Sequence, residues 1–196
     1  MLFDLLLFGH IMAAIIWLGS GFLIQVLATR ADRATDDQFL AKLLAHMGAL
    51  GNTLFIPASL AVLALGIGMT IESPAWNFDQ LWIILGLVGY AMTFIAGAGF
   101  LGPTGEKLGK AMAENRGHFT PETRTLARKL LAVSRIDFAV LVLVVVDMAL
   151  KPTADDVGVL AGMALVLVGV SILVAMQIRA LAAADADGRV PAAPAT

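Results

Sequence analysis

Residues 157–178 read VGVLAGMALVLVGVSILVAMQI and contain no charged side chain. A helix needs about 20 apolar residues to cross the hydrocarbon core of a bilayer, so this stretch predicts a membrane span. Similar stretches precede it at 5–28, 47–71, 81–101 and 130–150. Backbone groups in lipid must be hydrogen-bonded within their own segment, which predicts helices. The sequence therefore predicts an all-α, polytopic membrane bundle of five transmembrane helices within residues 1–181.

The composition excludes a soluble domain. Hydrophobic residues make up 59% of the chain and the mean hydropathy is +0.87, which leaves too little polar surface to cover a soluble fold of this length. The chain has no cysteine, so disulfides, iron–sulfur clusters and thiolate-bound haem or copper are excluded. No nucleic-acid partner is expected. Residues 182–196 are rich in Ala, Pro and Asp and predict a disordered cytoplasmic tail.

The positive charges are distributed very unevenly between the two sides. Of the 13 Lys and Arg residues, 12 fall on one alternating set of sides and Lys151 falls on the other. By the positive-inside rule the N-terminus is outside and the C-terminus is cytoplasmic, in a bacterial inner membrane. No positive charge precedes the first apolar stretch, so we expect this stretch to be retained. The fourth stretch is predicted to cross because Asp137 and Asp147 lie near its ends.

Capping residues and a proline predict local features of the helices. Thr120 before Pro121 is typical of a helix start, and Thr35 with Gln38 three residues on forms a second capping pattern. Pro57 predicts a kink in the second span.

Small residues at four-residue spacing predict close helix packing. They occur in the third span, at Gly89, Thr93 and Gly97, and in the fifth, at Gly158 and Gly162 before Gly169. Such ridges indicate a compact bundle. Such ridges also allow contact with a second copy of the chain, as in a homo-oligomer, or with another membrane protein. Membrane lipids are the other expected partners.

The most specific local pattern is His10 followed seven residues later by Trp17, in LFGHIMAAIIWLGSGF. Seven residues are close to two helical turns, so the two side chains share one face. A histidine within a membrane span is costly unless it is hydrogen-bonded or coordinated. Two readings stay open: His10 is a ligand, or its ring bonds a carbonyl and fixes the bundle. His46 is expected about 20 Å away in depth, which argues against a bis-histidine site within one chain.

Asp147 and Lys151 are one helical turn apart and predict a structural ion pair at the outer surface. Pro152 is expected to end this helix and Thr153 to cap the next. Asp147 and several methionines, among them Met69 and Met148, are expected at the level of His10. Histidine with methionine suits copper, whereas histidine with a carboxylate suits a harder cation or a proton relay. The candidate metal ligands are therefore His10 and Asp147.

The first helix resembles the opening helix of the copper-resistance D family and of the haem-associated membrane protoporphyrinogen oxidase family. This resemblance implies His10 as a ligand of copper or haem b, beside Trp17. The segments DMALKPTADD at 147–156 and SRID at 134–137, together with HIMAAIIWLGSGF, resemble a bacterial family of predicted integral membrane proteins of unknown function. That second resemblance spans nearly the whole chain and implies a small multi-span bundle without an assigned activity.

Three functions remain open from the sequence, and enzymatic activity is unassigned. The first is a haem- or metal-associated membrane protein with a redox or metal-handling role. The second is a non-enzymatic module that assembles or stabilises a membrane partner. The third is a permease for protons or a small solute that uses Asp147 and His10.

Overall fold

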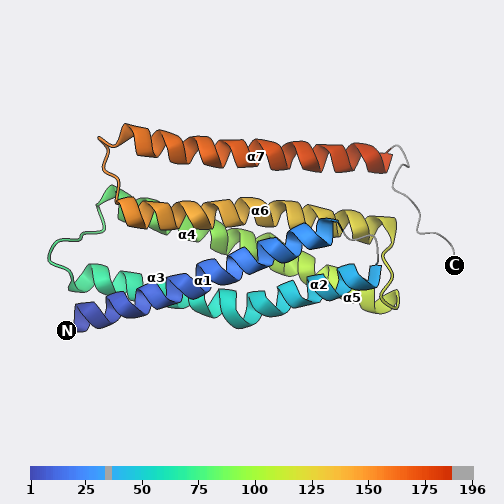
Figure 1. Cartoon of the computed structure of the whole chain (residues 1–196), viewed down its shortest axis with the longest axis horizontal. Coiled ribbons are helices and arrows are strands. Elements are labelled where there is room, and N and C mark those ends of the chain that lie inside the picture. The colour runs from blue at the N-terminus through green and yellow to red at the C-terminus, as the bar shows by residue number, and fades with distance from the viewer. Residues whose placement is uncertain (34–36, 187–196) are drawn as a thin grey trace.

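The computed structural model describes residues 1–33 and 37–186, and all regular structure in these ranges is helical (Figure 1). The elements are α1 (Leu2–Asp32), α2 (Asp37–Leu50), η1 (Gly51–Phe55), α3 (Ile56–Glu72), α4 (Leu81–Ala96), η2 (Gly97–Leu101), α5 (Gly102–Glu114), α6 (Pro121–Leu150) and α7 (Val157–Ala186). The predicted all-α bundle is confirmed. α7 extends beyond the predicted end of the fifth span at Ile178. Residues 187–196 of the predicted tail and Thr35 of the predicted capping pattern lie outside the described ranges.

Four helical rods are long and apolar enough to cross a membrane. They are Leu2–Ala31, Gln38–Glu72, Leu81–Glu114 and Val157–Ala183. The second rod runs from α2 through η1 into α3, and the third from α4 through η2 into α5. The remaining predicted span lies in α6, whose apolar part carries Arg135, Asp137 and Asp147. The crossing of α6 and the outward N-terminus stay predictions.

α6 is the central helix of the bundle. It contacts α1, α4, α5 and α7, and its residues Leu131, Leu141 and Asp147 are at most 1% exposed. α1 packs on α3, α4 packs on α6, and α7 lies outermost against α6 (Figure 1). Neighbouring helices therefore enclose Asp147, which removes the cost of presenting a carboxyl group to lipid.

The two π turns have the same cause in the sequence. Pro57 stands six residues after Gly51, which begins η1, and Pro103 stands six residues after Gly97, which begins η2. Proline has no N–H and its ring crowds the preceding turn, a mismatch that a wider turn relieves. The residue after each π turn donates its N–H to the carbonyl of that glycine, five residues earlier. The second span thus carries a π turn just before Pro57, and the predicted kink there stays a prediction. Gly97 begins the other π turn.

We call the end of the bundle that holds the start of α1 the outer end. The opposite end, where the described Lys and Arg residues other than Lys151 gather, is the inner end. A separate apolar core fills the inner end; its buried residues are Ala28, Ala31, Leu40, Leu43, Met47, Leu108, Met112, Phe119, Ala127 and Leu131. α5, a helix that was not predicted from the sequence, supplies Leu108 and Met112. The predicted cap of α6 is confirmed: Thr120 Oγ1 accepts from the Thr123 N–H at 3.3 Å.

The glycines of α4 and α7 differ in their packing. A Cβ atom at Gly89 would lie 2.4 Å from Val144 Cγ2 on α6, so the predicted close approach is confirmed there. At Gly158, Gly162 and Gly169 nothing described lies within 4 Å of such an atom. The small-residue face of α7 is therefore not used for packing against the described part of this chain.

Candidate functional site

His10 lies in the third turn of α1 and is held by α3. Its Nδ1 atom lies 2.9 Å from the carbonyl oxygen of Val62. A carbonyl oxygen only accepts, so Nδ1 carries the proton and donates this bond. The other ring nitrogen, Nε2, has no hydrogen-bond partner among the described residues. The bond thus fixes the ring and leaves a lone pair on Nε2 that can take a proton or a metal ion.

Trp17 lies two turns further along α1 and is 1% exposed. Its ring centroid is 5.9 Å from that of Phe55 and 5.8 Å from that of Tyr90. The indole Nε1 of Trp17 and the hydroxyl of Tyr90 are both buried, and neither has a hydrogen-bond partner in the described part of the chain. Each unpartnered buried group costs about 1–3 kcal/mol. Two such donors side by side indicate a place where a ligand could supply the missing bonds.

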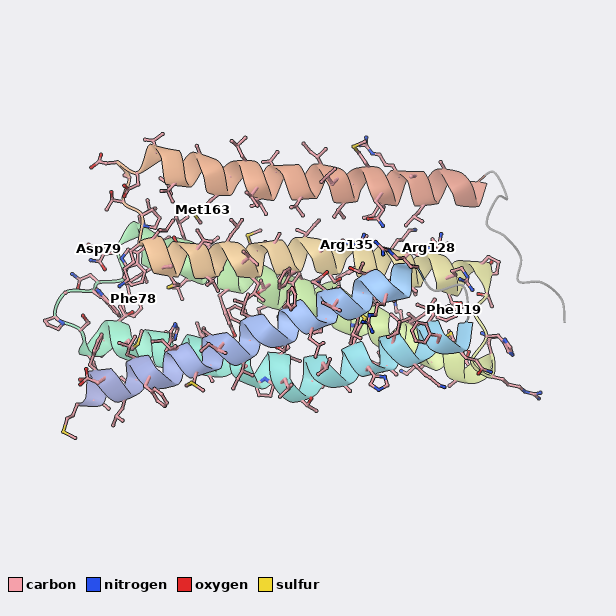
Figure 2. The ribbon with its side chains drawn as sticks, in the orientation of Figure 1. Phe78, Asp79, Phe119, Arg128, Arg135 and Met163 are labelled. Carbon is pink, nitrogen blue, oxygen red and sulfur yellow. The ribbon has the colours of Figure 1, made fainter. Side chains whose placement is uncertain are left out.

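A cavity of about 80 Å³ connects these side chains in the outer half of the bundle. It lies between the α1–α3 pair and the α4–α6 pair, and the residues that line it include His10, Trp17, Gly66, Ile67, Met69, Trp76, Phe78, Trp82, Gly86, Leu87, Tyr90 and Met148. The predicted shared face of His10 and Trp17 is thereby confirmed. Figure 2 shows Phe78 at the outer end, in the connection from α3 to α4. Ile67 and Leu87 are each 37% exposed, so the cavity reaches the lipid-facing surface between α3 and α4.

Asp147 stands beside this cavity, in the wall formed by α6. It is 1% exposed, and neither carboxyl oxygen has a hydrogen-bond partner among the residues described. Its Oδ2 lies 3.5 Å from the position that a Cβ of Gly86 would take. Gly86 and Met148 both line the cavity, so the carboxyl group adjoins the space that His10 borders.

The donor set of the cavity fits a single ion better than a large cofactor. Within residues 1–33 and 37–186, no three His, Cys, Asp or Glu side chains form a group that could hold a metal. Any ion would need the thioethers of Met69 and Met148 beside His10. Haem b does not fit: a cavity of about 150 Å³ holds one benzene molecule, and this cavity of about 80 Å³ is smaller. A porphyrin is several times larger than benzene.

Lys151 does not form the predicted ion pair with Asp147. Its Nζ lies over the rings of Trp76 and Trp82, 4.6 and 5.3 Å from their centroids. Lys151 ends α6 in the left-handed conformation, with φ 47°, and this turn carries its side chain away from the helix face of Asp147. Trp76 also packs edge-on against Phe3, at 5.3 Å between centroids. Lys151 therefore joins the α6 end to the aromatic side chains at the outer end of the cavity.

The turn into α7 is capped differently from the prediction. Thr153 was expected to cap the next helix, but the carboxylate of Asp156 accepts from the Thr153 backbone N–H at 2.8 Å and from its hydroxyl at 2.9 Å. These hydrogen bonds to the ionised form hold the pKa of Asp156 below its ordinary value. Asp156 thus closes the outer hairpin between α6 and α7.

His46 is far from the site, as predicted. It lies in α2 at the inner end, where its Nδ1 is 2.6 Å from the Lys42 carbonyl oxygen within the same helix. No bis-histidine arrangement forms with His10. His46 is therefore a histidine outside the cavity that can serve as a control for His10.

Three aromatic residues of the site were not predicted from the sequence. Trp76, Trp82 and Tyr90 are spread over the α3–α4 connection and α4, and no spacing rule links them to α1. One signal was available at Gly66, where a Cβ would lie 3.1 Å from His10 Cε1. A glycine on α3 opposite an intramembrane histidine leaves room for its ring, but which helix faces His10 is not visible in the sequence.

Residues 4–152 match a family described as predicted integral membrane protein (DUF2269). The matched region covers α1 through α6 and includes every residue named in the cavity wall. No curated protein and no solved structure matches the chain. The predicted membership is confirmed, because the match covers most of the chain. The chain therefore belongs to this family of predicted integral membrane proteins.

Proposed function

We propose that this protein binds a soft metal cation, Cu(I), in the outer cavity and has a metal-handling role in the membrane. One observation carries the proposal. His10 donates from Nδ1 to the Val62 carbonyl and retains an unpartnered Nε2 at the cavity. Metal-binding histidines commonly have this arrangement, in which a carbonyl fixes the ring and the tautomer.

The other cavity walls suit a soft monovalent cation. Imidazole and thioether ligands favour Cu(I), and Met69 and Met148 line the same cavity as His10. The buried carboxyl group of Asp147 and the faces of Trp17 and Tyr90 favour positive charge nearby. Methionine also fills gaps in apolar cores. A Met148→Leu variant distinguishes these two roles, because leucine keeps the volume and removes the sulfur.

The test is Cu(I) binding by the detergent-purified protein under reducing conditions, in competition with a chromophoric Cu(I) chelator. His10→Ala is compared with His46→Ala, which removes a histidine outside the cavity. We expect one bound Cu(I) per chain in the wild type and in His46→Ala, no binding in His10→Ala, and weakened binding in Met148→Leu. Equal binding by the two histidine variants would overturn the ligand assignment. An absorption spectrum with a Soret band would overturn the exclusion of haem b.

A second candidate function is assembly, and α7 favours it. α7 packs mainly on α6, and its three small residues Gly158, Gly162 and Gly169 face open space. Such a face allows close approach of another helix. We infer a second copy of this chain as the partner to test first. Gly162→Leu should then shift the protein from dimer to monomer in crosslinking within native membranes, and an unchanged crosslinking pattern would contradict this role.

The orientation follows from the charges and is part of the proposal. The Lys and Arg residues of the inner end would face the cytoplasm of a bacterial cell. Because the chain has no cysteine, single cysteines report each side directly. Asp155→Cys should react with an impermeant maleimide in intact cells, and Glu114→Cys should react only after lysis. The opposite pattern would reverse the orientation.

A further inference from the structure

A second hollow lies at the inner half of the bundle, on the opposite side of α6 from α4. It is a groove of about 520 Å³ between α1, α6 and α7. Gln25, Thr29, Arg135 and Gln177 form its polar part, and Phe138, Val170 and Leu173 are among its apolar residues. The groove shares no lining residue with the outer cavity.

The polar and apolar parts of the groove lie at different depths. Gln177 comes 20 residues after Val157, the first residue of α7. At 1.5 Å per residue this is about 30 Å, which matches the thickness of the hydrocarbon core. The polar part therefore lies at the inner interface. Val170 and Leu173 precede Gln177 on α7 and so lie within the hydrocarbon region.

Arg135 of α6 lines the groove, and a second arginine, Arg128, lies on the same helix nearer the inner end. The Arg135 Nη1 donates to Gln177 Oε1 at 2.6 Å, which positions the guanidinium against α7. Arg128 is seven residues earlier, so it lies on the same helix face about 10 Å nearer the inner end. Figure 2 shows both side chains on the side of α6 that faces α7. Arg128 is half-buried and forms no ion pair or hydrogen bond with any residue described.

We propose that this groove is a binding site for an anionic phospholipid of the inner leaflet. The phosphate is held by Arg128 and Arg135, and an acyl chain lies along Phe138, Val170 and Leu173. Arginine pairs well with phosphate oxygens, and basic pockets between helices on the cytoplasmic side are suited to lipid headgroups. The apolar part of the groove selects a lipid rather than a free phosphate ion, which would leave that part uncovered.

The test measures lipid retained by the purified full-length chain. Protein is reconstituted with equal amounts of phosphatidylglycerol and phosphatidylcholine of the same chain length, then delipidated mildly and analysed by native mass spectrometry. We expect retention of phosphatidylglycerol and a loss of at least about tenfold in the Arg128→Gln/Arg135→Gln variant, since hydrogen bonds to charged groups are strong. Lys129→Gln is the matched control, because it removes one charge beside Arg128 from a different helix face.

Two further arms make the result decisive. Leu173→Trp fills the apolar part of the groove without changing its charge, and we expect it to lower phosphatidylglycerol retention. Inorganic phosphate at millimolar concentration should not displace the lipid. The proposal is overturned if both lipids are retained equally or if free phosphate displaces the lipid. It is also overturned if Lys129→Gln loses as much phosphatidylglycerol as the double variant, or if Leu173→Trp retains all of it.

Discussion

The contact between Gly89 on α4 and Val144 on α6 allows a sharp test of the fold. In a Gly89→Ala variant the added Cβ would lie 2.4 Å from Val144 Cγ2. Carbon atoms in contact prefer about 3.5–4.0 Å, so the two helices must separate by roughly 1 Å or Val144 must change rotamer. Val144 is β-branched, 8% exposed and packed within the outer core, which restricts both responses.

The expected loss follows from two opposing effects. Overpacking of this kind costs about 1–3 kcal/mol, whereas replacing a helical glycine by alanine returns up to about 1 kcal/mol. We therefore expect the free energy of unfolding to fall by about 1–2 kcal/mol. Gly19→Ala on α1 is the control, because nothing described lies within 4 Å of its added Cβ. It should not lower the stability.

Unfolding in mixed detergent and SDS micelles, followed by far-ultraviolet circular dichroism, gives the free energies. Val144→Ala in the Gly89→Ala background should restore part of the lost stability, because it removes the clashing methyl groups. The coupling energy of the double-mutant cycle then measures this contact. The reasoning is refuted if Gly89→Ala is as stable as Gly19→Ala, or if the two substitutions at the contact are additive.

Two further predictions concern the outer end. Lys151→Gln should lower the free energy of unfolding by about 0.5–1 kcal/mol and change the tryptophan emission, because Lys151 Nζ lies over Trp76 and Trp82. The control Lys110→Gln, which removes an exposed ion pair with Glu106, should change neither property. If Asp147→Asn changed the emission as much as Lys151→Gln does, an ion pair between Asp147 and Lys151 would be favoured instead. The pKa of Asp156 is lowered in the folded protein. The stability that Asp156 gives the outer hairpin is therefore fully present above pH 3.8, its ordinary pKa, and is lost as the pH falls through the lower pKa of the folded state. The rate of amide hydrogen exchange at Thr153, corrected for the intrinsic rate, should rise on acidification in the wild type. Asp156→Ala should show no such rise. A rise of equal size in both proteins would exclude the cap by Asp156.

The helices themselves were predictable because their cause is local. Residues 157–178 must form a helix in lipid whatever lies next to them, since each backbone N–H has to find its acceptor within the segment. The same reasoning holds for the cap at Thr120 and for the disturbance at Pro57, which arise from neighbouring residues in the chain. α5 was not predicted because its residues are mostly polar. Which of its side chains are buried is decided by packing against α2 and α6.

The candidate site was predictable only in part. Helical spacing placed His10 and Trp17 on one face, and both line the outer cavity. The same kind of spacing gave the wrong partner for Lys151, because the left-handed turn at the end of α6 directs its side chain to Trp76 and Trp82. A spacing of four residues predicts contact only while the helix continues.

The sequence by itself determined the class of this protein, the positions of its apolar helices and the end of the bundle that carries the positive charge. These properties depend on hydropathy, backbone hydrogen bonding and charge counts along the chain. Only the tertiary structure decided that α3 faces His10, that α4 brings Tyr90 to Trp17, and that α6 encloses Asp147. The physical reason is that helical periodicity fixes which face a side chain occupies, whereas the neighbour of that face is chosen by packing between segments distant in the chain.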